Sequence, residues 1–202
     1  MNSDVLLIVL TENCWLYNGF ASLLPEMDCM MLKFSSKKLP DAVRNAGRVI
    51  VVVDSLIFFR GEWESYNYLK LNRPYALMFW LSRKETGCAF PVKSRGERVL
   101  NHQQDILSLR NALLGRPEKK EPAMYVSSTN LTLTERIQLP SLFSGMDAKL
   151  LSKITGKSVK TLYSHRQKIL AKTGFRQASF LHFVYNLNHG LPCLQEMISN
   201  TK

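Results

Sequence analysis

The first half of the chain alternates short apolar runs with segments whose apolar residues recur at helical spacing. Residues 4–10 (DVLLIVL) form an almost unbroken apolar run with branched side chains, which is typical of a strand buried on both faces. Residues 13–24 (NCWLYNGFASLL) instead place Trp15, Phe20 and Leu23 near one helical stripe. Repetition of this pattern predicts a parallel sheet flanked by helices. Further strands are expected at 29–34, 48–54 and 75–82, and further helices at 61–71 and 100–115.

The end of this half departs from a regular alternation of strands and helices. Only residues 83–87 separate the strand expected at 75–82 from another apolar run, 88–93 (CAFPVK). A parallel crossover needs about a dozen residues or more, and the KETG sequence favours a hairpin turn. We therefore expect an incomplete sheet of the flavodoxin-like kind, which lacks its usual fourth helix and ends in an antiparallel piece.

A change of pattern divides the chain. Residues 116–130 (RPEKKEPAMYVSSTN) contain two prolines, mixed charges and a polar end, which is the composition of a linker. Beyond this segment the pattern is helical throughout. We expect an α/β domain over residues 1–115, a linker over 116–130 and an all-α domain over 131–202.

The helical half carries start and stop signals for four helices. The first begins with a capping box made by Thr132 and Glu135, and the second ends at Gly156. Ser158 then caps the third helix, and the fourth is expected at 176–190. A short helix, a glycine turn and a second helix opened by a capping residue together predict a helix-turn-helix.

The charge distribution points to a kind of partner, because the excess of Lys and Arg over Asp and Glu is concentrated in the helical half. The formal net charge is +11, and residues 131–202 hold 10 Lys and Arg against 3 Asp and Glu. Residues 149–176 contain eight Lys or Arg and no acid. Like charges at i,i+4 spacing destabilise a helix, so we expect an anionic partner. The basic helix lacks a broad Trp/Phe face opposite its lysines, which favours nucleic acid over a membrane surface.

The third helix has two distinct sides. On a helix that begins at Val159, Leu162 and Ile169 fall on a core side. The residues expected on the open side are Tyr163, Ser164 and Gln167. In a helix-turn-helix the second helix enters the major groove, where its early residues reach base edges and flanking residues touch phosphates.

At these residues the chain resembles the LuxR/FixJ-type helix-turn-helix family, over residues 131–190. The matching positions are Leu131, Thr132, Glu135, Gly145, Ser158, Lys160, Thr161, Leu162, His165, Ile169, Leu170, Lys172, Gly174, His189, Gly190 and Leu191. Thr155 and Thr173 stand where the family usually has leucines, which should loosen the core, and Pro140 falls inside the first helix. Tyr163 replaces a commoner small or basic residue, so the family's sequence preference does not transfer.

The resemblance implies a four-helix DNA-binding domain that dimerises through its last helix and binds a two-fold related site. It places Tyr163, Ser164 and Gln167 at bases. It places Lys160, Thr161, His165 and Lys168 near phosphates. Ser158 opens the helix, where main-chain N–H groups favour an anion.

The first half resembles response-regulator receiver domains in the order of its elements. A working receiver needs two acids after strand one for Mg²⁺, an acceptor Asp, a Ser/Thr after strand four and a Lys after strand five. The corresponding residues here are Thr11, Glu12, Asp54, Ser82 and Lys93. Half of the acid pair is missing. Asp54 is thus a candidate phospho-acceptor, with an Asp that ends a strand and caps a turn as the favoured alternative.

Other kinds of site find little support in the sequence. There is no G-x-S-x-G, H-E-x-x-H, P-loop or G-x-G-x-x-G motif, and the four cysteines form no C-x-x-C pair. We expect neither an enzyme nor a metal site nor a cofactor. The N-terminal apolar run is too short to span a membrane and lacks the basic flank of a signal peptide, so we expect a cytoplasmic protein.

Two functions remain open. The first is a bacterial transcription regulator, not controlled by conventional phosphorylation, that binds promoter DNA as a homodimer or heterodimer. The second is a protein–protein adaptor that heterodimerises with another regulator and has little DNA selectivity of its own. Aromatic residues that would mark an interface if exposed motivate the second: Trp63, Tyr66, Phe79 and Trp80.

Overall fold

The computed structural model describes residues 5–82, 90–101, 103–116, 124–125 and 131–188. The chain forms two compact units, one made of residues 1–82 with 97–125 and the other of 83–96 with 126–202. Most of the expected linker lies outside the described residues. The linker and the domain boundaries drawn on either side of it therefore stay a prediction.

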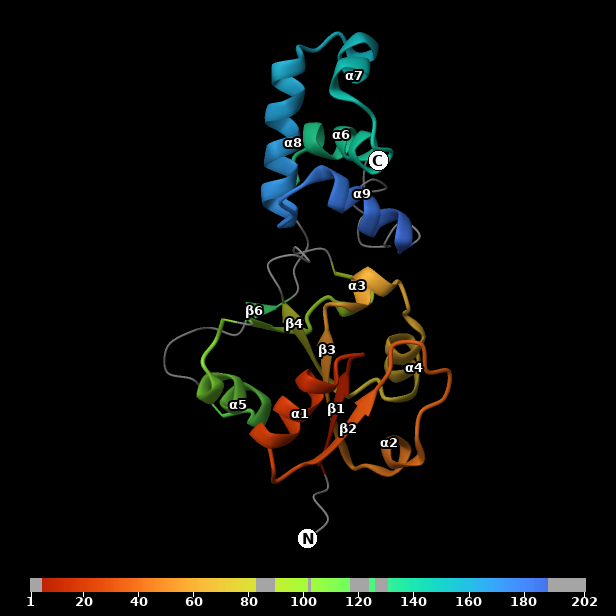
Figure 1. Ribbon diagram of the computed structural model, residues 1–202, viewed down its shortest axis with the longest axis vertical. Coiled ribbons are helices and arrows are strands. Elements are labelled where there is room, and N and C mark those ends of the chain that lie inside the picture. Colours follow the sequence, from red (N-terminus) through yellow and green to blue (C-terminus); the bar gives the residue numbers. More distant parts are fainter. Residues whose placement is uncertain (1–4, 83–89, 102, 117–123, 126–130, 189–202) are drawn as a thin grey trace. The chain divides into compact units, whose positions relative to one another are not determined.

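The α/β unit is built on one six-stranded sheet (Figure 1). The strand order is β2-β1-β3-β4-β5-β6, in which the first five strands are parallel and β6 is antiparallel to β5. The strands are β1 (Val5–Leu10), β2 (Asp28–Leu32), β3 (Arg48–Asp54), β4 (Leu77–Ser82), β5 (Arg98–Asn101) and β6 (Met124–Tyr125). The order of the five parallel strands is that of flavodoxin-like sheets, which confirms the predicted class.

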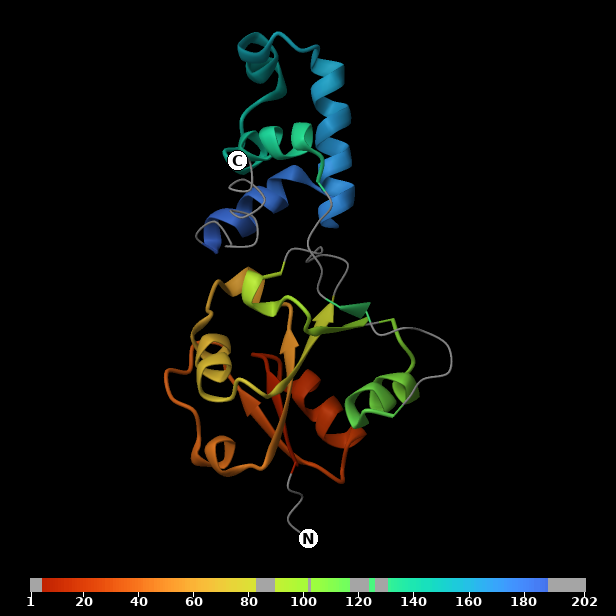
Figure 2. The same cartoon turned by 180° about the vertical axis from the view of Figure 1, so that it is seen from behind.

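Helices cover both faces of this sheet, as the two opposite views show (Figures 1 and 2). Helices α1 (Cys14–Leu23) and α5 (Ile106–Leu114) lie over one face. Helices α2 (Asp41–Asn45) and α4 (Glu64–Asn72) lie over the other, and the short α3 (Ile57–Arg60) follows β3. Cover on both faces explains why β1 and β3 are apolar without interruption.

The core of the α/β unit sits between the sheet and these helices. On the side of α1, Leu7 and Val9 of β1 pack with Ile50 and Val52 of β3 and with Phe20. All five side chains are buried. Complete burial of a large apolar side chain stabilises the fold by about 1.5–3 kcal/mol. The two central strands therefore fix the carboxyl edge of the sheet, where Asp54 lies.

The connection between β4 and β5 differs from the prediction. No strand forms in the described part of 88–93, because Val92–Ser94 is a 3₁₀ turn, η1. The next strand is β5, which pairs in parallel with β4, so the crossover spans 83–97 and is long enough for that arrangement. The described part of this crossover, residues 90–97, contains η1 and no α-helix, and the expected lack of a fourth helix stays a prediction. The sheet does end in an antiparallel strand, but that strand is β6, from the expected linker.

The helix expected from residue 100 begins later. Leu100 belongs to β5 and is buried in the sheet, and Asp105 caps α5 by accepting a hydrogen bond from the Ser108 amide at 2.9 Å. Helix α5 ends as predicted at Gly115, whose φ of 72° lies in the left-handed region that favours glycine. The apolar pattern alone did not separate the strand from the helix.

The second unit contains four helices in its described residues, and these are α6 (Leu133–Phe143), α7 (Ala148–Thr155), α8 (Val159–Thr173) and α9 (Ala178–Leu187). Helix α6 packs against α8 and α9, and α7 packs against α8. Their shared core contains Leu139, Leu142, Leu162, Ile169 and Leu181. Among the described residues of the whole chain, no helix has the length and apolar character that a membrane crossing requires.

Candidate nucleic-acid interface

Local chemistry fixes the turn between α7 and α8. Gly156 ends α7 with a φ of 67°, in the left-handed region where glycine is favoured. The hydroxyl of Ser152 donates to the Lys157 carbonyl at 2.7 Å. Ser158 then caps α8, since its Oγ accepts from the Thr161 amide at 3.1 Å. The predicted boundaries of the helix-turn-helix are confirmed.

The core side of α8 tolerates the threonine that replaces a leucine. Leu162 and Ile169 are fully buried, as predicted, and so is Thr173. The Thr173 hydroxyl donates to the Ile169 carbonyl at 2.8 Å, so no unpaired polar group enters the core. Thr155 is exposed and bonds to the Leu151 carbonyl within its own helix. The expectation that Thr155 loosens the core is therefore wrong.

The open side of α8 presents the residues that the sequence placed there. Tyr163 is 53% exposed, and Ser164 and Gln167 are exposed as well. Of the other candidate contact residues, His165 is half-buried. The exposed ones are Ser158, Lys160, Thr161 and Lys168. Their contact with DNA stays a prediction, but each exposed one is sterically able to make it.

The eight cations between residues 149 and 176 fall into two groups, which the sequence did not distinguish. Seven are exposed, and six of these form no ion pair among the described residues, namely Lys149, Lys153, Lys157, Lys160, Lys168 and Arg176. The remaining two, the half-buried Arg166 and the exposed Lys172, hold the unit together. Arg166 donates from Nη2 to the Met146 carbonyl, and Lys172 pairs with Glu135. The cations available to an anionic partner are therefore fewer than the sequence suggests.

The ion pair of Lys172 joins the end of α8 to the start of α6. Its Nζ lies 2.7 Å from Glu135 Oε2, and the Glu135 side chain is only 4% exposed. The same carboxylate accepts from the Thr132 amide at 2.7 Å and completes the predicted capping box. Burial alone would raise the pKa of Glu135, but the hydrogen bond from Lys172 and those from Thr132 outweigh it and lower that pKa.

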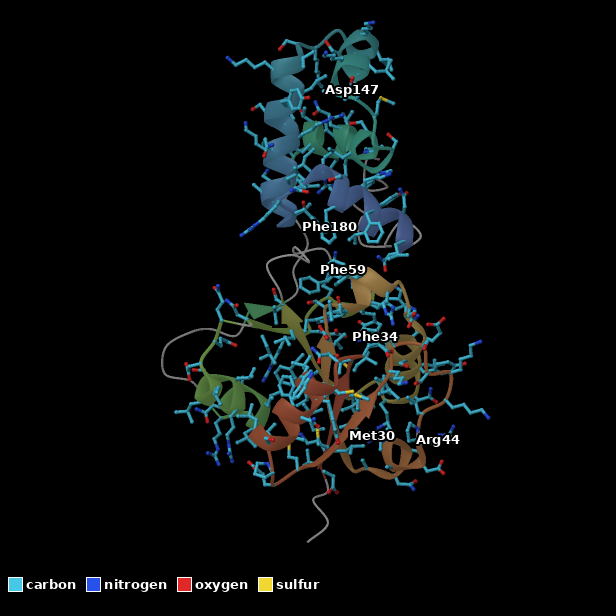
Figure 3. The ribbon with its side chains drawn as sticks, in the orientation of Figure 1. Met30, Phe34, Arg44, Phe59, Asp147 and Phe180 are labelled. Atoms are coloured by element: carbon cyan, nitrogen blue, oxygen red, sulfur yellow. The ribbon has the colours of Figure 1, made fainter. Side chains whose placement is uncertain are left out.

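Helix α9 is held on α6 and leaves one aromatic side chain outside. The rings of Phe143 and Tyr185 stack with centroids 3.8 Å apart, and a ring nitrogen of His182 bonds to the Phe143 carbonyl. Phe180 lies on this helix (Figure 3), and Phe183 is 49% exposed. The matching positions His189, Gly190 and Leu191 lie outside the described residues.

The candidate phospho-acceptor is buried at the carboxyl edge of the sheet. Asp54 ends β3 with no exposed surface, and its Oδ2 accepts from the Thr11 hydroxyl at 2.7 Å. Its Oδ1 accepts from the Leu56 amide at 3.1 Å. Glu12 points elsewhere, since its carboxylate accepts from the amide of Phe34 (labelled in Figure 3) at 3.1 Å. In a working receiver, an acid pair at this place would bind a cation. Here the Thr11 hydroxyl contacts Asp54 instead.

The other residues that a working receiver needs are only partly present. Ser82 ends β4 and pairs in register with Asn101 of β5. Lys93 lies in η1 before β5, so its match to a lysine after strand five is wrong. The residues that follow β5 in the sequence are His102, Gln103 and Gln104. No group of three or more His, Cys, Asp or Glu that could hold a metal occurs among the residues that the structure describes.

The aromatic residues that suggested an adaptor surface belong to the core. Tyr66, Phe79 and Trp80 are each at most 1% exposed. Trp63 is half-buried, and its ring lies 5.7 Å from that of Tyr66. The indole of Trp80 donates to the buried carboxylate of Glu97 at 2.6 Å. The expectation of an exposed aromatic patch at these four residues is wrong, because helices cover both faces of the sheet and bury the side chains on both sides of β4.

Comparison with known proteins finds similar structures but no similar sequences. No protein-family model and no curated protein matches the chain. A DNA complex of the two-component response regulator RcsB aligns with a TM-score of 0.59 and 14% identity, over 91% of this chain and 98% of that chain.

Two complexes of RcsB from Salmonella enterica serovar Typhimurium, both formed in the presence of the phosphomimetic BeF3−, are also similar. The one on promoter rprA has a TM-score of 0.59 and 17% identity over 89% of this chain and 97% of that one. The one on promoter P1flhDC has a TM-score of 0.57 and 13% identity over 92% and 99%. The chain therefore has the fold of response regulators in which a receiver-like domain precedes a LuxR/FixJ-type helix-turn-helix, as the sequence resemblance predicted.

Proposed function

We propose that this protein is a bacterial transcription regulator that binds double-stranded promoter DNA through α8. One observation carries the proposal: α8 exposes Tyr163, Ser164 and Gln167 on a side bordered by exposed lysines, with no acid between residues 149 and 176. A helix with side chains is about 10–12 Å across, which fits a major groove about 12 Å wide. The similar RcsB structures, which are DNA complexes, support it.

Affinity and choice of site would come from different residues. Lys160 and Lys168 are exposed on α8, and each would displace condensed counterions from a phosphate. The first turn of α8 adds main-chain N–H groups and the positive end of the helix dipole. Tyr163, Ser164 and Gln167 would face base edges, which carry the sequence information. A DNA-binding role of this kind places the protein in the cytoplasm.

The dependence of binding on salt tests the assigned phosphate contacts. The affinity of the full chain for duplex DNA should fall linearly on a log–log plot against salt concentration. The double variant Lys160→Ala/Lys168→Ala should flatten that slope by about 2, because each phosphate contact contributes about 0.9. Fluorescence anisotropy with a labelled duplex over a series of salt concentrations measures the slope.

A matched control removes the same charge elsewhere. Lys37 and Lys38 are exposed in the loop after β2, so Lys37→Ala/Lys38→Ala lowers the net charge equally. This variant should keep the slope of the parent protein. Equal slopes for the two double variants would refute the assignment of Lys160 and Lys168, and a flat salt dependence of the parent protein would refute DNA binding.

The proposed binding unit is a dimer. The two copies would contact each other through α9 and bind a two-fold related DNA site through their α8 helices. Phe183, half exposed on α9, is an apolar side chain that a second copy would cover. Sedimentation of the protein with duplexes that carry one or two half-sites tests this: two copies should bind the two-fold related duplex cooperatively. Binding of a single copy to that duplex would contradict the dimer.

An adaptor function is not favoured, because three of the four aromatic residues that motivated it are buried. A nuclease footprint separates the two functions. The purified protein should protect a promoter site by itself. Protection that appears only when another regulator is added would instead support an adaptor that forms heterodimers.

A further inference from the structure

We propose that α8 selects A·T base pairs, with Gln167 as the residue that recognises adenine. This inference rests on the proposed function, because it requires α8 in a major groove. It concerns the side of α8 made by Tyr163, Ser164 and Gln167, called the reading face below.

The chemistry of the reading face is neutral. A phenol, a hydroxyl and a carboxamide are its functional groups, and among the described residues none of the three side chains forms a hydrogen bond. Guanine presents two acceptors in the major groove, which are best matched by the donors of Arg or Lys. Adenine presents one acceptor and one donor. The carboxamide of Gln167 has one donor group and one acceptor, so it pairs with adenine through two hydrogen bonds.

Tyr163 strengthens the same preference. It lies one helical turn before Gln167, on the same side of α8, and the residue is 53% exposed. The edge of an aromatic ring makes a favourable apolar contact with the thymine methyl group, which no other base carries. Gln167 on adenine and Tyr163 on a neighbouring thymine methyl would together read consecutive A·T pairs.

Of the four cations on α8, two are held by contacts within the unit, and the exposed Lys168, like Lys160, is assigned to a phosphate. Arg166 is turned toward the α6–α7 loop by its bond to the Met146 carbonyl, and Lys172 is held by Glu135. Lys160 does share the side of Gln167, two turns closer to the helix start. At that end, beside the Ser158 cap, we assign it to a phosphate. Its effect on affinity should therefore be the same for every sequence.

Selection of bound duplexes from a randomised library, with the full-length protein, tests the preference. The selected half-sites should contain an invariant adenine, and its replacement by guanine should weaken binding by about 5- to 150-fold, the range of one bidentate base contact. Gln167→Ala should lose this discrimination. Gln167→Arg should select guanine at the same position, and Lys160→Ala should weaken all duplexes alike.

The outcomes separate this inference from the proposed function. A G·C-rich half-site, or an unchanged preference in Gln167→Ala, would overturn the inference while leaving DNA binding intact. Loss of a guanine preference in Lys160→Ala would overturn it too, since Lys160 would then be reading a base. Absence of salt-dependent binding to every duplex would overturn the proposed function and the inference with it. Gln167 is exposed, so these variants should fold normally.

Discussion

The contact between Thr11 and Asp54 shows how one residue changes the chemistry of a receiver-like edge. An acid at position 11 would set a second carboxylate beside Asp54, and a bound cation would be needed to offset their repulsion. Thr11 instead donates a hydrogen bond at 2.7 Å, and both side chains are fully buried. The neutral hydroxyl adds a hydrogen bond and no second charge beside Asp54.

Removing this donor should destabilise the α/β unit. Thr11→Val keeps the shape of the side chain but withdraws a hydrogen bond from a buried carboxylate, which costs about 1–3 kcal/mol. All three tryptophans, Trp15, Trp63 and Trp80, lie in this unit, so urea unfolding followed by tryptophan fluorescence reports its free energy of unfolding. Thr11→Ser is the control, because it retains the hydroxyl. Equal losses in the two variants would show that packing, not the hydrogen bond, matters.

At the level of helices and strands, one ion pair, between Lys172 and Glu135, adds to the apolar packing of α6 against α8. Glu135 has a lowered pKa in the folded protein, so the folded state binds fewer protons than the unfolded state near that pKa. Its contribution to stability is therefore complete above the ordinary glutamate pKa of about 4.3 and is lost as the pH falls through the lowered value.

Replacing the lysine of this pair should remove that pH dependence. At neutral pH, Lys172→Met leaves a buried carboxylate without its cation and should cost about 1–2 kcal/mol, because Lys172 is partly exposed and Glu135 keeps its bonds to Thr132. Below the lowered pKa the same substitution should cost much less, since Glu135 is then neutral. Hydrogen exchange of the α6 and α8 amides measures the loss. Lys168→Met, at an exposed lysine of the same helix, should have little effect at either pH.

What the sequence predicted at this scale was mostly local. The Ser158 cap, the Gly156 stop and the Thr132–Glu135 box are set by neighbouring residues, so their patterns were sufficient. The pairing of Lys172 with Glu135 depends on how two helices pack, so no local pattern in the sequence indicated it. The apolar run at 88–93 forms no strand in its described part, 90–93, for the same reason. Its apolar residues fit a strand, but the sheet placed β5 at Arg98–Asn101.

Over the whole molecule, the excess of basic residues and the candidate phospho-acceptor lie in different units. Residues 131–202 carry ten of the 27 basic residues against three of the 16 acids. In the α/β unit, the side chain of Asp54 is fully buried. A phosphorylated receiver changes the output of its DNA-binding domain through the acceptor Asp and its Mg²⁺. In this chain the acceptor position is buried and half of the acid pair is replaced by Thr11.

We therefore propose that Asp54 does not control DNA binding through phosphorylation. Adding BeF3− with Mg²⁺, a mimic of the phosphoryl group, should leave the DNA affinity of the full chain unchanged, because the Thr11 hydroxyl and the Leu56 amide already bond both oxygens of a carboxylate with no exposed surface. Anisotropy titration of a labelled duplex measures this. Asp54→Asn, which is nearly the same shape, should bind DNA as the parent does. A rise in affinity with BeF3− that Asp54→Asn abolishes would show instead that the edge opens and that Asp54 is a working acceptor.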